Sequence, residues 1–271
     1  MNPNKELIIL KLGGSVITKK SEGKPEVDGE NLKRLAKEIA DAKKKKNFSL
    51  VIVHGAGPFG HVPAKRYGLD KGIMDEEQMK GFSITHQSME KLNFQVVEAL
   101  QRHMINAVAY QPSAVGILKN RRLIYFPTIV MEELISRGVV PVAYGDVLLD
   151  EETGVNILSG DHLVPYLADT LNANRVIMAA DVPGIFDSDP KKNKNAKLIK
   201  EIDSRNISQI REIGTSRGTD VTGGMERKLN ELLRLTELGI ESEIVSAIEP
   251  GILRRTLLGE RGLGTIIKTD P

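Results

Sequence analysis

Short apolar runs alternate with amphipathic segments along the whole chain. The runs are rich in β-branched residues and are typical of buried strands. They occupy residues 6–14, 48–55, 106–111, 138–146, 175–181, 241–247 and 264–268. Between them, apolar residues recur at helical spacing, and Asp28 or Asn31 is placed to cap the first such segment. Helices are therefore predicted over residues 28–46, 75–103, 129–138, 161–173, 223–239 and 249–260.

This alternation of strands and helices predicts the α/β class, as a three-layer αβα sandwich with a mainly parallel central sheet. Residues 147–161 depart from the pattern, because two short apolar runs flank the turn-like segment 151–154. They predict a β-hairpin. No linker rich in Pro or Ser divides the chain, so we expect a single domain over residues 1–271.

Composition narrows the possible functions. The chain has 38 basic and 36 acidic residues, and a formal net charge of +2 gives no indication of a nucleic-acid or membrane-surface partner. It contains no cysteine, which excludes disulfides, thiol nucleophiles and thiolate metal sites. The first apolar run is too short for a signal peptide, and no run approaches the length of a membrane span. We therefore expect a cytoplasmic protein with no membrane partner.

Glycine-rich turns follow several of the predicted strands. They are KLGGS (11–15), HGAGPFGH (54–61), YGD (144–146), which leads to SGD (159–161), and AADVPG (179–184); TGGMERK (222–228) begins a helix. The carboxyl ends of parallel strands meet at one edge of the sheet, where ligands bind. Backbone N–H groups in such turns bind phosphate oxygens. The sequence therefore predicts a phosphate site at that edge.

Two well-known phosphate motifs give different answers. The pattern GxxxxGK[ST] is absent, which excludes a P-loop enzyme. GAGPFG fits the dinucleotide fingerprint GxGxxG, but that motif needs an acidic residue at the end of the second strand, about 20 residues later. The acidic residues near 70–77 fall in a predicted loop and helix start instead. A dehydrogenase is therefore a minor alternative.

Lysines accompany the glycine turns. Lys11 ends the first strand, Lys19 and Lys20 lie in the loop beyond it, and Lys228 lies in the first turn of a helix. A cation at a helix N-terminus opposes the helix dipole and is favourable when an anion lies beside it. These positions indicate phosphoryl transfer, in which positioning and charge neutralisation carry catalysis.

Together with QPSA (111–114), DVPGIFDSDP (181–190) and DVTGGMERK (220–228), these motifs resemble those of the amino acid kinase superfamily, in the same order and over nearly the whole chain. His61, which closes the second glycine loop, resembles a histidine of the isopentenyl phosphate kinase family. That family transfers phosphate from ATP to isopentenyl phosphate, giving isopentenyl diphosphate for isoprenoid biosynthesis. The resemblance implies an N-terminal part that mainly binds the acceptor phosphate, a part from about residue 175 that mainly binds ATP, Mg²⁺, and a homodimer.

The resemblance also implies roles for individual residues. The catalytic set is Lys11, Lys20, His61 and Asp161, with Lys19 as the alternative to Lys20 because the count depends on the loop. His61 would bind the acceptor phosphate, Lys11 the transferred phosphoryl group and Lys228 the ATP phosphates, while Asp161 would fix the catalytic lysines. The ATP-binding set is Lys11, Gly13, Gly14, Ser15, Gly57, Asp181, Gly184, Gly224 and Lys228. The acceptor-binding set is Gly55, Ala56, Gly60, His61, Phe82, Thr85, Met89, Ile157 and Gly160. No cluster of side chains dedicated to a metal is evident, and His54, next to the strand, is interpreted as structural.

A five-carbon acceptor also needs a small apolar pocket. Phe82, Thr85 and Met89 share one face of the predicted helix over 75–103, and Ile157 on the hairpin is a candidate opposite wall. The same stripe is typical of plain core. Two residues depart from the family pattern: Pro58 removes one backbone N–H from the glycine loop, and Pro183 replaces a usual acidic residue of the nucleotide loop.

Several alternatives stay open at this point. Fosfomycin kinase shares the histidine loop, so a phosphonate acceptor fits the same motifs. An amino acid acceptor fits less well, because nothing in it would use His61. A non-catalytic nucleotide-binding regulator would be expected to lack the lysines that this chain retains.

Overall fold

The computed structural model describes residues 5–19, 25–72, 75–188, 190, 193–203, 205–206 and 223–268, without the side chains of 223–228 and 231. The strands are β1 (Leu7–Leu12), β2 (Ser49–His54), β3 (Ala107–Ala109), β4 (Ile117–Lys119), β5 (Arg122–Tyr125), β6 (Val140–Tyr144), β7 (Asp146–Asp150), β8 (Gly154–Leu158), β9 (Arg175–Ala180), β10 (Glu201–Ile202), β11 (Glu241–Ser246) and β12 (Thr265–Ile267). The helices are α1 (Gly14–Ile17), α2 (Gly29–Lys45), α3 (Gly57–Arg66), α4 (Glu76–Arg102), α5 (Ile129–Ser136), α6 (Gly160–Thr170), α8 (Gly223–Glu237) and α9 (Ile252–Leu257), with 3₁₀ turns η1 (Leu69–Lys71) and η2 (Pro112–Ala114). No helix in these described ranges is both long enough and apolar enough to cross a membrane.

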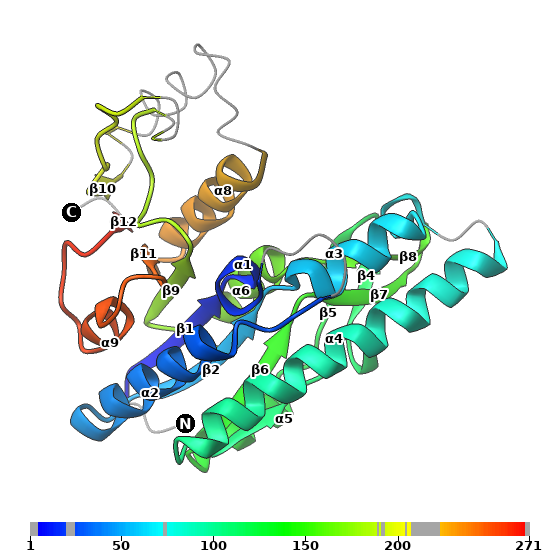
Figure 1. Ribbon diagram of the computed structural model, residues 1–271, viewed down its shortest axis with the longest axis horizontal. Coiled ribbons are helices and arrows are strands. Elements are labelled where there is room, and N and C mark those ends of the chain that lie inside the picture. Colours follow the sequence, from blue (N-terminus) through cyan, green and yellow to red (C-terminus); the bar gives the residue numbers. More distant parts are fainter. Residues whose placement is uncertain are drawn as a thin grey trace.

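The main sheet has the strand order β10-β12-β11-β9-β1-β2-β6-β3 (Figure 1). Neighbouring strands run parallel except β11 and β12, which are antiparallel. β1 pairs with β2 on one side and β9 on the other, so its carboxyl end lies at the middle of the sheet edge. The predicted mainly parallel α/β sheet is confirmed.

Helices cover both faces of this sheet. Ile8, Leu10 and Leu12 of β1 belong to a core shared with α1, α2, α3, α4 and α9. Leu7 and Ile9 belong to the opposite core, shared with α5, α6 and α8. Side chains alternate along a strand, so Lys11 has the parity of Leu7 and Ile9 and points toward the face that α6 covers. Strand alternation therefore decides which helix meets this lysine.

A second, four-stranded sheet with the order β5-β4-β7-β8 lies beside the main one. β7 and β8 form the antiparallel hairpin that the sequence predicts. The β4–β5 hairpin was not predicted, because both strands are short and partly polar. The carboxylate of Asp150 links the two turns by accepting hydrogen bonds from the backbone N–H groups of Asn120, Arg121, Glu152 and Thr153.

The segment 54–61 differs from expectation. The sequence predicts a glycine turn over these residues, but the turn is brief and α3 begins at Gly57. Pro58 lies in the first helical turn, where a backbone N–H has no partner within the helix, so the proline costs the helix nothing. His61 is therefore presented from the first turns of a helix and not from a loop.

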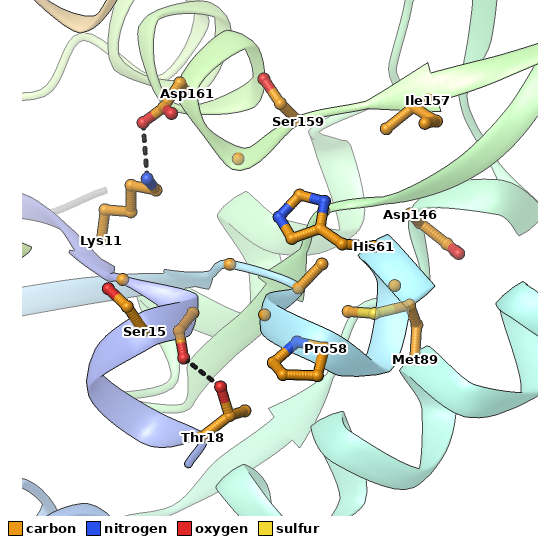
Figure 2. Close-up of a pocket in the computed structure, with 18 of the residues that line it drawn as sticks. Lys11, Ser15, Thr18, Pro58, His61, Met89, Asp146, Ile157, Ser159 and Asp161 are labelled. Carbon is orange, nitrogen blue, oxygen red and sulfur yellow. Dashed lines mark hydrogen bonds and ion pairs between the residues drawn. The ribbon is translucent and has the colours of Figure 1, made fainter. Parts of the chain in front are cut away.

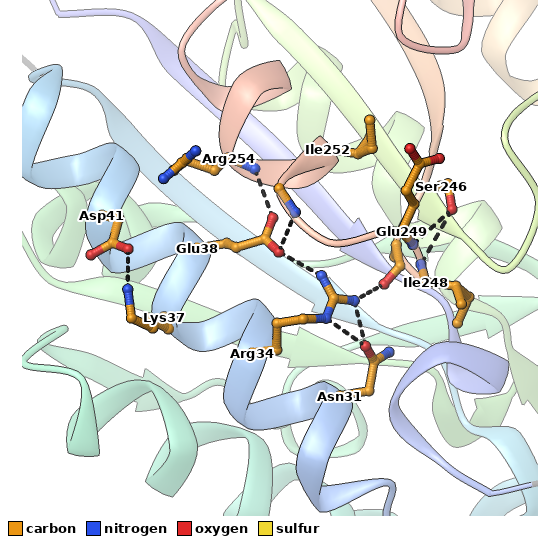
Figure 3. Close-up of polar contacts among 12 residues, drawn as sticks. Asn31, Arg34, Lys37, Glu38, Asp41, Ser246, Ile248, Glu249, Ile252 and Arg254 are labelled. Atoms are coloured by element: carbon orange, nitrogen blue, oxygen red, sulfur yellow. Dashed lines mark hydrogen bonds and ion pairs between the residues drawn. The ribbon is translucent and has the colours of Figure 1, made fainter.

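A buried polar network joins α2 to the chain after β11 (Figure 3). Glu38 is 7 % exposed and accepts the N–H of Gly251 at 2.8 Å and of Arg254 at 3.0 Å, which caps the start of α9. Arg34 lies one turn earlier and donates to Glu38 at 2.5 Å and to the carbonyl of Ala247. The carboxylate therefore satisfies donors from two helices at once.

Glu38→Ala should lower the free energy of unfolding by about 2–4 kcal/mol, because it leaves two backbone N–H groups without an acceptor and removes the carboxylate paired with a partly buried guanidinium. Asp41→Ala on the same helix is the matched control, since Asp41 forms only an exposed pair with Lys37. The control should change stability by less than about 0.5 kcal/mol. Urea denaturation measures both, and equal effects of the two substitutions would contradict the assigned role.

Candidate active site

A cavity of ≈ 470 Å³ lies at the carboxyl edge of the main sheet (Figure 2). The turns after β1, β2, β6 and β9 line it, together with the start of α6 and one side of α4. This is the edge at which the sequence predicts a phosphate site. Among the residues proposed from the sequence, those that line the cavity are Lys11, Gly13, Gly14, Ser15, Gly55, Ala56, Gly57, Gly60, His61, Thr85, Met89, Ile157, Gly160, Asp161 and Asp181.

The turns after β1 and β2 pack backbone against backbone. A Cβ atom on Gly55 would lie 2.6 Å from the nitrogen of Gly14, and one on Gly14 would meet the nitrogen of Gly57. Gly57 has φ of 51°, in the left-handed region that favours glycine. Thr18 fastens the first turn by donating from Oγ1 to the Gly14 carbonyl at 2.6 Å. Glycine is therefore required here for the close approach of two loops.

Lys11 is the charged centre of the cavity. It is 7 % exposed, and its Nζ lies 2.5 Å from Oδ1 of Asp161 in the first turn of α6 (Figure 2). Burying an ammonium without a counter-ion is costly, and the Asp161 carboxylate offsets this desolvation cost. The pair still lines the cavity, where the ammonium is close enough to serve an anionic ligand.

Two further groups converge on the same space. His61 on α3 is exposed and lies between the glycine turn and the hairpin in Figure 2. Ser159 caps α6 by accepting the His162 N–H, which brings the helix N-terminus and Gly160 to the cavity wall. A helix N-terminus, an imidazole and a lysine that line one cavity are groups that can hold a phosphate anion.

The end of the cavity away from Lys11 is mostly apolar, although Asp146 also lies on this side. Ala64, Met89, Val147 and Ile157 line it, with Thr85 beside them. Phe82 does not line this space and packs behind it, against the small core of Ala64, Tyr67, Leu69 and Val147. Helical periodicity puts Phe82, Thr85 and Met89 on one face, but the position along α4 decides which of them reach the cavity.

Thr85 has an unusual environment. It is 2 % exposed, and its hydroxyl oxygen has no hydrogen-bond partner in the described part of the chain. A buried hydroxyl without a partner lowers stability by the cost of its desolvation.

Not every predicted residue falls in the cavity. Gly184 lies outside it, at φ 156° and close to Thr265. Lys19 is described but exposed, and it pairs with Glu26 at 2.5 Å; the hydrogen bond to Glu26 raises the pKa of Lys19. Lys20 lies outside the described residues, as do the side chains of the first turns of α8, which include the predicted Gly224 and Lys228.

His54 has the structural role expected of it. It is fully buried; Nδ1 lies 3.0 Å from the Gly55 carbonyl, Nε2 lies 3.1 Å from the Asn93 amide nitrogen, and the ring stacks on Tyr144. Burial lowers the pKa of His54 to about 4, so the ring is neutral at physiological pH. The carbonyl only accepts, so Nδ1 carries the proton and Nε2 accepts from Asn93. The ring thereby holds the first peptide of the second glycine turn.

Some residues of the site were missed. Asp146, Val147 and Ser159 line the cavity but were not proposed as site residues. Asp146 and Ser159 belong to the quoted YGD and SGD motifs, which give a signal for the segment without assigning a side chain. Val147 carries no sequence signal beyond strand alternation. In the described residues, no group of three or more His, Asp or Glu side chains is placed to hold a metal ion.

Comparison with known proteins gives the class first. Residues 6–246 match the model of the amino acid kinase family, and the chain belongs to that family. It is 42% identical over 267 residues to an isopentenyl phosphate kinase of Methanothermobacter thermautotrophicus, covering 96% of this chain and 98% of that protein. An isopentenyl phosphate kinase of Arabidopsis thaliana is 33% identical and covers 85% of this chain and 76% of that protein.

Solved structures agree with this placement. One described as isopentenyl phosphate kinase superposes with a TM-score of 0.84 at 39% identity, covering 97% of this chain and all of that one. A product complex of the Thermoplasma acidophilum isopentenyl phosphate kinase gives a TM-score of 0.75 at 27% identity, with coverage of 97% and 100%. The family resemblance seen in the sequence motifs is confirmed.

Gly55→Ala should lower kcat/KM by about 10²-fold or more, because its Cβ would push apart two turns that position the reacting groups. Gly29→Ala is the control, since a Cβ there meets nothing within 4 Å. It should leave kcat/KM unchanged. Steady-state kinetics of the two variants test this, and a fully active Gly55→Ala enzyme would contradict the close approach.

Thr85→Val should raise the free energy of unfolding by about 1 kcal/mol, because a methyl group replaces a buried hydroxyl that has no partner. Thr256→Val is the matched control: Thr256 is also buried in a helix, but its hydroxyl donates to the Ile252 carbonyl at 2.9 Å. The control should lose about 1 kcal/mol. Thermal denaturation of both variants gives the sign, and a loss in Thr85→Val would mean that its hydroxyl is bonded in solution.

Proposed function

We propose that this chain is a kinase that transfers the γ-phosphoryl group of ATP to isopentenyl phosphate and forms isopentenyl diphosphate. The observation that carries the proposal is one cavity in which the Lys11–Asp161 pair and His61 adjoin a small apolar end. The identity to relatives named isopentenyl phosphate kinase supports the choice of acceptor.

The proposed reaction needs no general base. An oxygen of the acceptor phosphate forms a bond to the γ-phosphorus of ATP, the bond from that phosphorus to the β-bridging oxygen breaks, and ADP leaves. The acceptor oxygen is already anionic, so activation is a matter of position and charge. Lys11 neutralises charge on the transferred group, and Asp161 holds the lysine in place at 2.5 Å. His61 and the N–H groups at the start of α6 bind the acceptor phosphate.

ATP is placed across the turn after β1 and the end of β9. In this arrangement the backbone of Gly14 would lie toward the phosphates and Asp181 toward the nucleotide, while the Gly13 N–H is already bonded to the Ala179 carbonyl at 2.9 Å. The assignment of ATP mainly to the part of the chain from about residue 175, within a single domain, stays a prediction. Mg²⁺ takes most of its ligands from phosphates and water, and the carboxylates of Asp161 and Asp181 line the same cavity, so the residues fit this ion. When bound, Mg²⁺ supplies further charge neutralisation at the ATP phosphates.

A homodimer stays a prediction, as does a cytoplasmic location. α4 supports the first, because Phe94 on it is 68 % exposed and borders a surface hollow with Val27, Val97 and Ala109. Light scattering of the purified chain measures the assembly directly.

The test of the proposed function is ADP release with ATP, Mg²⁺ and one acceptor at a time: isopentenyl phosphate, fosfomycin, acetylglutamate or UMP. Turnover should be fastest with isopentenyl phosphate. A preference for fosfomycin would assign a phosphonate acceptor to the same site, and no turnover with any acceptor would support a nucleotide-binding regulator.

Two substitutions separate the roles within the site. Lys11→Ala should lower kcat by about 10²–10³-fold with a folded protein, because it removes charge stabilisation of the transferred group.

His61→Ala should raise the KM of the acceptor and leave the KM of ATP unchanged, with His103→Ala as the control. If ATP binding weakened and acceptor binding did not, the two substrates would be on the opposite loops.

A further inference from the structure

The apolar end of the cavity lies between two elements that are distant in sequence. Thr85 and Met89 come from α4, and Val147 and Ile157 come from the β7–β8 hairpin. The width of this end therefore depends on how closely the hairpin lies against α4. A polar contact joins the hairpin to α4, and it lies directly beside the apolar end.

That contact is made by Asp146, the first residue of β7. Its side chain is fully buried, and it lies on the side of His61 away from Lys11 in Figure 2. Among the described residues, its carboxylate has two partners: the Val147 N–H at 2.9 Å and Nδ1 of His86 on α4 at 3.2 Å. A buried carboxylate with so few partners depends strongly on each of them. The imidazole thus ties the hairpin to α4.

His86 is built to hold this position in both of its charge states. Its Nδ1 donates to Asp146, because a carboxylate only accepts. Its Nε2 lies 2.8 Å from the Gln111 amide nitrogen, which donates to the neutral ring. When the ring is protonated, Nε2 donates instead to the amide oxygen of Gln111, once that amide is turned, or to Glu90, whose Oε1 is 3.5 Å away.

The surroundings of His86 favour the charged ring. The charged groups that face it are Asp146 from β7 and Glu90 from α4 itself, while Gln111 and Ser113 from the η2 segment are neutral. The hydrogen bond to Asp146 raises the pKa of His86 above its usual 6.5. Glu90 and Gln111 also border the surface hollow on the far side of α4, and the ring is 19 % exposed, so protons reach it without entering the active site.

We propose that the His86–Asp146 pair is a clasp that sets the width of the apolar end of the cavity and so restricts the acceptor to short chains. His86 is a positioning residue in this scheme, since it acts through Asp146 and the hairpin. The inference rests on the proposed function, because it assigns the apolar end to the hydrocarbon part of the acceptor. Neither residue was proposed as a site residue from the sequence.

The clasp makes acceptor selectivity depend on pH in a defined direction. A raised pKa means that the charged pair is complete below the ordinary histidine pKa and weakens as pH rises through the raised value. Above it, a neutral hydrogen bond remains and the hairpin is held less tightly. Preference for a five-carbon over a ten-carbon alkenyl phosphate should therefore fall as pH rises.

The experiment measures kcat/KM for isopentenyl phosphate and geranyl phosphate from about pH 6 to pH 9, the range in which a histidine titrates. The ratio of the two values is the readout. Ionisation of the acceptor phosphate affects both substrates alike and cancels in the ratio. In the unmodified enzyme the ratio should fall by about tenfold across this range, which is equivalent to about 1.4 kcal/mol of selectivity.

Three variants complete the test. His86→Gln removes the titrating group, and Asp146→Asn removes the charge but keeps the shape, so both should give a low ratio that no longer changes with pH. His103→Gln is the matched control at the C-terminal end of α4; among the described residues its ring bonds to the Ala99 carbonyl, away from the cavity, so it should retain the full pH profile.

The outcomes separate this inference from the proposed function. If isopentenyl phosphate is not phosphorylated at all, the proposed function fails. If it is phosphorylated and the ratio of the unmodified enzyme is flat with pH, the clasp is wrong, whether or not the variants fold. A variant that loses activity on both chain lengths with an unchanged ratio would give His86 a purely structural role and also overturn the clasp.

Discussion

The close approach of two glycine turns is the constraint on which the site depends. Gly14 and Gly55 follow adjacent parallel strands, and a single methyl group on either would collide with the backbone of the other turn. Because the turns touch, residues of both turns line one common cavity. An additional side chain at this contact would separate the region proposed to bind ATP from the one proposed to bind the acceptor phosphate.

The positive charge near that contact is Lys11, and the alternation of side chains along β1 decides where it points. Lys11 lies one residue before the last of β1, on the side of Leu7 and Ile9, and therefore points toward α6. There it meets Asp161 at 2.5 Å. A lysine one residue earlier or later would enter the opposite core, among Leu10 and Leu12, without a carboxylate. Register and burial together decide that, among the positions near the end of β1, only this one can hold a cation at the cavity.

Sequence patterns anticipated the layers of the fold well, because β-branched runs and helical periodicity are local signals. They were less reliable where local signals compete. The glycines of 54–61 suggested a turn, but α3 begins at Gly57, and Pro58 falls in its first turn, where helices tolerate proline. The short strands β4 and β5 gave too weak a pattern to be recognised, and depend on pairing with each other and with β7.

In the candidate site, too, the parts with a local sequence signal were predicted and the parts that depend on distant contacts were not. Glycine motifs and lysines identified the phosphate end, because phosphate chemistry restricts which residues can serve. The apolar end was predicted only in outline: Thr85, Met89 and Ile157 line it, whereas Phe82 lies behind it. The pairing of His86 with Asp146 joins residues 60 positions apart, and no local pattern indicates such a contact.

The helix α4 contributes side chains to the cavity, to the hairpin contact and to the ring of His54. Over its 27 residues it contributes Thr85 and Met89 to the apolar end, His86 to the hairpin, and Asn93 to the buried ring of His54. The groups proposed to act on phosphate come from β1, α3 and α6 instead. Substitutions on the first turns of α4 can therefore change which hydrocarbon fits without moving Lys11 or Asp161. Substitutions near Asn93 would disturb His54, which holds the glycine turn, and would therefore affect the phosphate end as well. A fold arranged in this way can alter its acceptor while Lys11 and Asp161 stay fixed.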